Sequence, residues 1–266
     1  MANECQAAEA AWIWCDDFDQ DRIASYFEYS SASGSFVRTQ GVGVDASFGM
    51  RTQFAQGQDD AGALRLAFGR TPSSYVAPVD AGTQDYRELY WRIFLRNQAG
   101  WTGGGAEKLT RATSLVTGNW AQAMIAHVWS GQNLPERDRL ILDPASGTDA
   151  AGNLQTTTYN DFGNLRWLGA DIGDTALFAT AGVGQWYCIE AHVKLNDAGS
   201  SNGVFELWID DVLDAQRTGL NWVGAYAAYG MNAVFVENFW NVGSPAQQER
   251  YIDNFIVSTE RIGCGI

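Results

Sequence analysis

Residues 89–96 read Leu-Tyr-Trp-Arg-Ile-Phe-Leu-Arg, and this stretch decides the fold class. Apolar side chains occupy every second position, at Leu89, Trp91, Ile93 and Leu95, and Tyr90, Arg92, Phe94 and Arg96 lie between them. Successive side chains of a β-strand point to opposite faces of the sheet, so this period of two predicts a strand with one buried face.

Similar runs, rich in Val, Ile, Phe, Tyr and Trp, predict further strands along the chain. They lie at 122–129, 138–143, 186–195, 204–210, 232–239 and 251–258. Turn-forming sequences such as the three glycines at 103–105 separate them. Only two short helices are expected, over 5–12 and 245–250. Many short strands with few helices predict a β-sandwich or barrel.

The composition limits the classes of partner. The 266 residues carry a formal net charge of −14, from 31 acidic and 17 basic residues. This argues against nucleic acid, which recruits basic patches, and against anionic membranes. No apolar run approaches the roughly 18 residues of a membrane span. A polyanionic substrate suits this charge only where the few basic residues gather in one groove. The sequence contains no signal for an oligomeric state.

The four cysteines, Cys5, Cys15, Cys188 and Cys264, are widely spaced, and none forms a Cys-x-x-Cys pair. A structural zinc site is therefore not indicated. An even number of distant cysteines favours two disulfides in an oxidising compartment, with four buried thiols as the alternative. Met1 precedes Ala-Asn-Glu-Cys like a start residue placed before a mature N-terminus. We therefore expect a secreted or extracellular protein whose signal peptide has been removed.

Four segments together resemble a known superfamily. Residues 14–19 read WCDDFD, 186–196 read WYCIEAHVKLN, 203–211 read GVFELWIDD and 251–259 read YIDNFIVST. The series resembles the concanavalin A-like jelly-roll proteins and, within them, the polysaccharide lyases of the alginate and glucuronan type, over most of the chain. The resemblance implies an all-β fold, a two-sheet antiparallel jelly-roll β-sandwich formed as a single domain over 1–266, with a polysaccharide as partner.

The resemblance also implies a disulfide pairing. In such folds the first and last strands are usually antiparallel neighbours. If Asp17 lies opposite Asp253, the register brings the first cysteine close to the last one and leaves the middle two to pair. The implied disulfides are Cys5–Cys264 and Cys15–Cys188, although sequence alone does not determine connectivity.

The same pairing of strands would gather Asp17, Asp19 and Asp253. Calcium takes about six to eight oxygen ligands, some of them backbone carbonyls. Members of the superfamily often hold a structural calcium near these strands, so the resemblance implies one here, and no cofactor for catalysis. The alternative is that these aspartates cap turns on the surface.

Residues 101–111, WTGGGAEKLTR, resemble the glycine-rich segment and following strand of the lyases, in which a lysine faces the substrate groove. Carried over, this lysine is Lys108, one of only two in the chain. A lyase removes the proton at C5 of a uronic acid and needs an acid, a base and a group that neutralises the carboxylate. Lys108 is the catalytic candidate, with a solvated lysine at a strand edge as the alternative.

The strand expected over 122–129 places His127 and Trp129 on one face. A titratable ring beside an aromatic platform suits a sugar-binding groove, so His127 joins Lys108 as a candidate for the catalytic acid or base, and a core histidine bonded to a backbone carbonyl is the alternative. In the related lyases the following strand carries tyrosines, but residues 138–143 contain none. Tyr159, in the long polar stretch 144–165, is the candidate substitute.

Cationic and aromatic side chains supply the remaining candidates. Arg92, Arg96 and Arg111 are candidates for the substrate carboxylate, with the first two on one face of their strand. Tryptophans beside glycine or asparagine turns are expected at the surface, where sugar rings can stack on them. They are Trp101, Trp120, Trp129, Trp167, Trp222 and Trp240, of which Trp101 and Trp129 are the binding candidates.

Two functions remain in view. The paired carboxylates of β-glucanases with this fold, spaced Glu-x-Asp-x-x-Glu, are absent from the sequence. The leading interpretation is a lyase that cleaves a uronic-acid polysaccharide by β-elimination. The second is a carbohydrate-binding or adhesion module without turnover, which the missing tyrosines favour.

Overall fold

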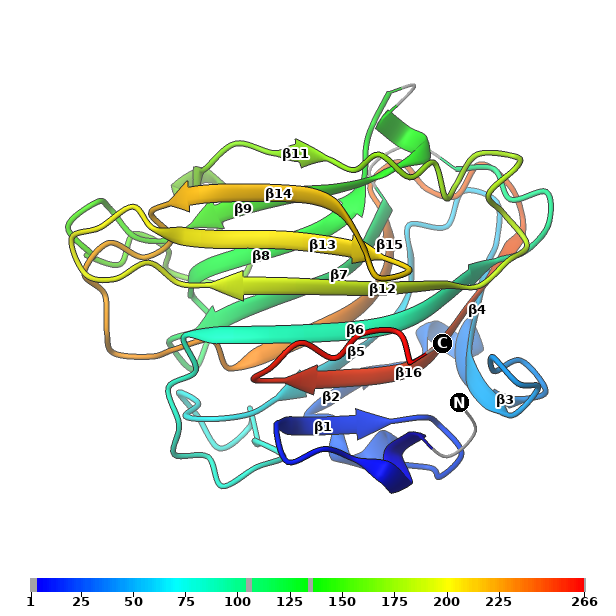
Figure 1. Cartoon of the computed structure of the whole chain (residues 1–266), viewed down its shortest axis with the longest axis horizontal. Helices are drawn as coiled ribbons and strands as arrows, with labels where there is room; N and C mark the ends of the chain where they lie inside the picture. Colours follow the sequence, from blue (N-terminus) through cyan, green and yellow to red (C-terminus); the bar gives the residue numbers. More distant parts are fainter. Residues whose placement is uncertain (1–3, 104–106, 134–135, 266) are drawn as a thin grey trace.

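Two antiparallel sheets packed face to face make up the computed structural model, which describes residues 4–103, 107–133 and 136–265 (Figure 1). Sheet A contains β1 (Trp12–Asp16), β3 (Phe36–Gln40), β4 (Phe48–Phe54), β6 (Glu88–Asn97), β12 (Tyr187–Lys194), β13 (Gly203–Ile209), β14 (Val212–Leu220) and β16 (Gln248–Ser258). Sheet B contains β2 (Glu28–Ser30), β5 (Asp60–Ala67), β7 (Glu107–Leu115), β8 (Gln122–Ser130), β9 (Leu140–Ser146), β10 (Arg166–Trp167), β11 (Asp171–Ile172) and β15 (Ala233–Trp240). The short 3-10 helices are η1 (Glu4–Ala7), η2 (Ile23–Ser25), η3 (Ala32–Gly34), η4 (Glu136–Asp138) and η5 (Phe162–Asn164).

The strand order interleaves distant parts of the chain. Sheet A runs β14-β13-β12-β6-β16-β4-β3 with β1 beside β16, and sheet B runs β10-β9-β8-β7-β15-β5-β2 with β11 beside β9. The all-β, two-sheet jelly-roll expectation is thus confirmed. In the described ranges, no helix is long and apolar enough to cross a membrane.

The core lies between the sheets and follows the alternation in β6. Leu89, Trp91, Ile93 and Leu95 are each 1% exposed or less and belong to one apolar cluster. The indole Nε1 of Trp91 donates to the Thr110 hydroxyl of sheet B at 3.0 Å, which satisfies its polar atom inside this layer. The intervening residues of β6 therefore face away from the core, on the outward face of sheet A.

A charged pair also lies in this layer. Arg250 of β16 approaches Glu107 of β7 at 3.1 Å, and both side chains are nearly inaccessible to solvent. Arg250 also donates to the Asn97 amide oxygen at 3.0 Å. Burial raises the pKa of Glu107 to about 7, against the opposing effect of the nearby guanidinium. The pair joins the two sheets directly beside the start of β7.

Several strands lie where the sequence predicted them, but three segments differ. Residues 5–12 contain only η1 before β1 begins, and 245–250 runs into β16 instead of forming a helix. The strand expected over 138–143 begins two residues later, because η4 ends at Asp138. The apolar content of such short segments does not distinguish a helix from a strand.

The two expected disulfides are present, but the predicted pairing is wrong. The structure joins Cys5 to Cys15 and Cys188 to Cys264. β1 and β16 are antiparallel neighbours as expected, and Cys15 lies opposite Ile256. The chain before β1 folds back along β1 through η1, so the first cysteine meets the second.

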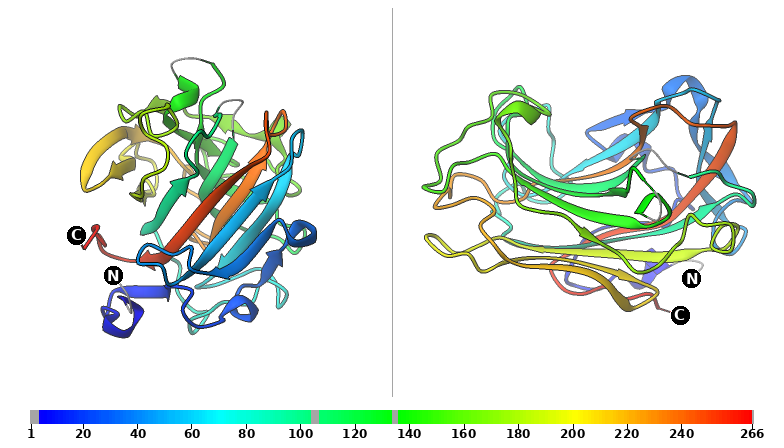
Figure 2. Two further views of the ribbon diagram at one scale, coloured as in Figure 1. Left: turned by 90° about the vertical axis from the view of Figure 1, so that its right-hand side faces the viewer. Right: turned by 90° about the horizontal axis from the view of Figure 1, so that it is seen from above.

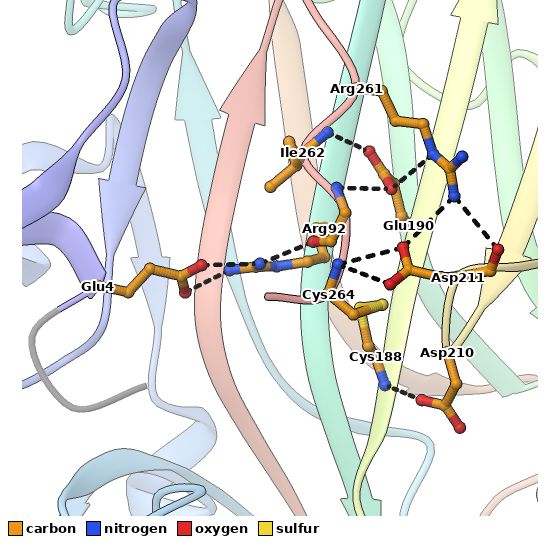
Figure 3. Close-up of a disulfide and its surroundings, with 10 residues drawn as sticks. Glu4, Arg92, Cys188, Glu190, Asp210, Asp211, Arg261, Ile262 and Cys264 are labelled. Carbon is orange, nitrogen blue, oxygen red and sulfur yellow. Dashed lines mark hydrogen bonds and ion pairs between the residues drawn. A yellow bond between two sulfur atoms is a disulfide. The ribbon is translucent and has the colours of Figure 1, made fainter. Parts of the chain in front are cut away.

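The C-terminal segment explains the other disulfide (Figure 3). After β16 it crosses the outward face of sheet A, where the amides of Ile262 and Gly263 donate to Glu190 of β12 at 2.7 and 3.1 Å. This path carries Cys264 to Cys188. The β13–β14 turn supports both cysteines: the Cys188 and Cys264 amides donate to Asp210 and Asp211.

The β13–β14 turn has an unusual backbone conformation. Asp210 and Asp211 have φ values of 50° and 66° between β13 and β14. Two consecutive residues with positive φ are typical of a type I′ hairpin, and aspartate tolerates this conformation better than most residues.

The two disulfides should differ in their contribution to stability. Cys188 and Cys264 are 76 positions apart, whereas Cys5 and Cys15 are 10 apart. Loop-closure entropy predicts that Cys188→Ser/Cys264→Ser lowers the free energy of unfolding by about 2 kcal/mol more than Cys5→Ser/Cys15→Ser does. Denaturant unfolding of both variants measures this difference, and equal losses would contradict it.

Candidate functional site

Cavities along the outward face of sheet B form a groove. Figure 2, right, shows the strands of this sheet curving into a trough, away from sheet A. Three adjoining cavities of about 460, 180 and 240 Å³ lie along it. The first two share Lys108, Phe162 and Asn241, and the last two share Trp129. Side chains of the loop before β10 line the first two cavities together with strand residues.

Lys108 lies where two of these cavities meet. Its strand β7 begins there, and β8 brings Trp129 alongside as its cross-strand partner. The ammonium lies 4.4 Å from the ring centre of Phe239 and 6.0 Å from that of Phe162. Burial lowers the pKa of Lys108, and although Glu237 opposes this shift, no carboxylate in the described part of the chain forms an ion pair with the ammonium.

Arg111 organises the end of the large cavity. It is fully buried and pairs with Glu237 of β15 at 2.7 Å. Its guanidinium also donates to the Tyr159 hydroxyl and, at 2.8 Å, to the side-chain oxygen of Asn160. Arg111 is therefore not exposed to a ligand carboxylate. It holds two loop residues, Tyr159 and Asn160, against the groove.

These contacts define the hydrogen-bonding capacity of the loop. The Tyr159 oxygen accepts from Arg111, so its own O–H remains able to donate. Asn160 uses its oxygen in the same way, which leaves its NH₂ group for a ligand. Burial raises the pKa of Tyr159, and the charge of Arg111 opposes that rise. The groove thus presents a protonated phenol beside an amide donor.

His127 lies beneath the aromatic side chains of the groove. Its ring stacks on Trp129 at 4.5 Å and on Trp167 at 5.8 Å. Its Nδ1 lies 3.1 Å from the Asp143 carbonyl oxygen, which can only accept, so Nδ1 carries the proton. The histidine is 1% exposed, as the core alternative described, and Nε2 is buried without a hydrogen-bond partner among the described residues. Its role as acid or base stays a prediction that this burial does not favour.

The structure thus brings Lys108, Arg111, His127, Trp129 and Tyr159 together on one face. It does not bring Arg92 or Arg96 there, because β6 belongs to sheet A and their side chains point away from the core. Their predicted role in the groove is wrong. Arg92 is buried against Glu4, with N–O distances of 2.9 and 2.5 Å.

Trp101 was also assigned wrongly to the groove. It is 4% exposed and stacks on Trp240 in the core at 5.7 Å. Trp222 and Trp240 are fully buried as well. A turn beside a tryptophan does not make it a surface residue when the neighbouring strands cover it. Trp167, 43% exposed, does lie at the surface. The adjoining glycines 104 and 105 lie outside the described residues.

Several groove residues were not singled out from sequence. They are Asp60, Arg65, Asn160, Phe162, Glu237, Phe239 and Asn241. The long polar stretch 144–165 was the available signal, since loops of that length are often functional. The β15 residues gave no such sequence signal, because alternation does not distinguish a phenylalanine on the outward face from one in the core.

The proposed calcium ligands do not form a binding site. Asp253 accepts from the Val44 and Asn254 amides, both at 2.8 Å, and Asp19 accepts from the Phe48 amide at 3.2 Å. Asp17 accepts from the amide of Asp19. Over residues 4–103, 107–133 and 136–265, no group of three or more His, Cys, Asp or Glu side chains is placed to hold a metal. Calcium binding therefore stays a prediction, and the arrangement of these three aspartates does not fit it.

His127 should remain neutral well below the ordinary titration range. Burial lowers its pKa well below 6.5, and the positive charge of Arg111 adds to this effect. We expect ¹⁵N NMR to show a protonated Nδ1 and an unprotonated Nε2 as the pH falls through 6.5, with His127→Gln identifying the signals. A titration midpoint near 6.5 would contradict the buried, stacked environment.

No family model matches the chain, and no curated protein matches it. Solved structures do match. An alginate lyase from Aplysia kurodai has a TM-score of 0.62 at 12% identity, covering 94% of this chain and 100% of that one. An endo-β-1,4-glucuronan lyase from Trichoderma reesei has a TM-score of 0.61 at 12% identity, covering 94% and 96%.

A further match is an alginate lyase from a Chlorella virus, with a TM-score of 0.56 at 10% identity and 98% coverage of both chains. At such identities the likeness concerns the fold. This chain therefore shares the jelly-roll sandwich of these polysaccharide lyases.

Proposed function

We propose that this protein is an extracellular lyase that cleaves a uronic-acid polysaccharide by β-elimination, with Lys108 and Tyr159 transferring the protons. The observation that carries the proposal is the position of Lys108. It is a lysine with no ion pair among the described residues, it is partly desolvated, and it lies in a groove beside a phenol held by an arginine.

Lys108 would act as the base. Desolvation disfavours its charged form, so a neutral amine is accessible at lower pH than in a solvated lysine. In the reaction the amine takes the C5 proton, and the C5–H electrons move into the uronate group as an enolate. These electrons form the C4–C5 double bond as the C4–O bond breaks, and the departing oxygen takes a proton from the Tyr159 hydroxyl.

Charge that develops on the uronate group during proton removal needs donors. The Asn160 NH₂ group can supply them, because its side-chain oxygen is already bound by Arg111. Arg111 would thus act through Asn160 and Tyr159 as a positioning residue. The Glu237 carboxylate balances its charge in the buried site.

The groove also has surfaces for sugar rings. Phe162 and Trp167 lie with ring centres 6.3 Å apart, and Trp167 continues to Trp129 at 6.3 Å. Phe162 and Trp167 are 42% and 43% exposed. Aromatic faces of this kind stack on the apolar face of a sugar. They also favour the second candidate, a carbohydrate-binding module, which needs this aromatic row without proton transfer.

The proposed location outside the cell is supported by the two disulfides. Disulfides persist in oxidising compartments and are rare where thiols are kept reduced. A polysaccharide substrate agrees with this location.

Elimination should require both proton-transfer residues. We expect ultraviolet absorbance of unsaturated uronate to appear with at least one of alginate, glucuronan, pectate and glycosaminoglycans. Lys108→Ala and Tyr159→Phe should each lower the rate about 100-fold or more. The control is Lys194→Ala, which removes the chain's other lysine, half exposed on β12 of sheet A. If no polymer yields product but binding is retained, the lyase proposal fails and the carbohydrate-binding module remains as the function.

The pH dependence separates a base from a fixed cation. If neutral Lys108 takes the proton, the rate rises with pH through its lowered pKa, at a pH below 10.5. Lys108→Arg keeps the positive charge but cannot deprotonate, so it should be as inactive as Lys108→Ala. An active Lys108→Arg variant with an unchanged pH profile would show that only the charge matters.

A further inference from the structure

Arg96 is exceptional among the arginines of this chain. Each of the other arginines donates a hydrogen bond or forms an ion pair within the described residues. Arg96 does neither there, although a guanidinium has five N–H donors. Its Nε is buried without a partner, whereas its terminal nitrogens are not buried. A cation that is held in place with unused donors is prepared for a ligand.

Two aromatic rings pack against the guanidinium of Arg96. The guanidinium carbon lies 4.9 Å from the ring centre of Trp186 and 4.6 Å from that of Tyr251. Tyr251 is its cross-strand partner on β16, and Trp186 precedes Tyr187, which pairs with Leu95. All three side chains belong to the outward face of sheet A. The two rings restrict the rotamers of Arg96 without using its donors.

A cavity of about 220 Å³ lies beside this group. It is lined by Arg96, Asn97, Gln98, Ala99, Gly184 and Tyr251. The Asn97 side chain is bonded to Arg250 between the sheets. The cavity therefore combines a cation, the amide side chain of Gln98 and an aromatic ring, which are components that protein sites use for polar ligands with one apolar face.

Nearby carboxylates do not cancel the charge of Arg96. Glu249 accepts from the Tyr251 hydroxyl at 2.6 Å and lies 3.8 Å from Arg51, which balances it. Asp253 is 1% exposed, and burial raises its pKa to about 7. The local excess of charge around Arg96 is positive, in a protein of net charge −14.

We infer that Arg96, Trp186 and Tyr251 form a second carbohydrate-binding site, on the outward face of sheet A, for a carboxylate-bearing sugar of an acidic polysaccharide. Arg92 shows the chemistry on the same strand and face: its two terminal nitrogens contact the two oxygens of Glu4. Arg96 can bind a uronate carboxylate with the same bidentate geometry, with the sugar ring against an aromatic face.

This site has no part in bond cleavage. It lies on the sheet opposite the groove, so one protein molecule would contact the polymer at two faces. The choice of an acidic polymer rests on the proposed function, but binding at Arg96 is measured without turnover. The two proposals can therefore fail separately.

The experiment uses affinity electrophoresis in gels containing alginate, glucuronan or neutral hydroxyethylcellulose. The chains compared are Lys108→Ala, Lys108→Ala/Arg96→Gln and Lys108→Ala/Lys194→Ala, so that the polymer stays intact. We expect Arg96→Gln to weaken retention by an acidic polymer about tenfold, corresponding to about 1.4 kcal/mol. Lys194→Ala removes one positive charge from the same sheet and should change retention less than about twofold, as expected for an exposed cation.

Three further results complete the test. Arg96→Gln should melt at the same temperature as the parent, and neither variant should bind hydroxyethylcellulose more weakly than the parent. Arg96→Lys, which keeps the charge but loses the planar fork, should resemble Arg96→Gln. Equal retention of the Arg96→Gln and Lys194→Ala chains on both acidic polymers would overturn the inference, and the lyase proposal would stand on its own assay.

Discussion

The apolar layer between the sheets determines which side chains can meet a ligand. Every strand that contributes to this layer buries alternate residues in it, as β6 does with Trp91, Ile93 and Leu95. What remains are two outward faces. On sheet B the strands curve into a groove, and on sheet A the terminal segments cover part of the surface through Glu4, Gly263 and the Cys188–Cys264 disulfide. Function is therefore a property of the faces that the core leaves available.

The same layer places Lys108. Glu107, its neighbour in β7, is buried against Arg250 of sheet A, and the Arg250 guanidinium also reaches the Lys108 carbonyl oxygen at 3.5 Å. Removing two charges from water is costly, and their pairing together with the bond to Asn97 offsets that cost. A pair of this kind tolerates little displacement, since moving either partner leaves the other charge buried alone. The start of β7 is therefore held relative to β16, and Lys108 with it.

Alternation along the sequence predicted which residues share a face in β6 and β8, and the structure agrees for the four core residues of β6 and for His127 with Trp129. It did not predict which sheet a face belongs to, and this is why Arg92 and Arg96 were placed in the groove. The disulfide pairing failed for a related reason. Strand periodicity carries no information about the path of the segments before β1 and after β16. The resemblance pointed to Lys108, the long loop to Tyr159 and strand alternation to Trp129, whereas Phe239 and Asn241 have no comparable pattern.

The acidic balance of the chain makes Lys108 and Arg96 significant, because within the described residues neither side chain forms an ion pair or donates a hydrogen bond. In the described part of the chain the other basic side chains are engaged by carboxylates, backbone carbonyls or other polar side chains. A polyanion approaching a surface of charge −14 is repelled at long range. At about 0.1 M salt this repulsion is screened beyond roughly 10 Å, but contacts in a desolvated groove or beside stacked rings are screened much less. Salt therefore weakens the long-range repulsion more than the local attraction at these two cations. A uniformly basic surface would bind any polyanion, whereas an acidic protein with two placed cations can bind an acidic polymer selectively.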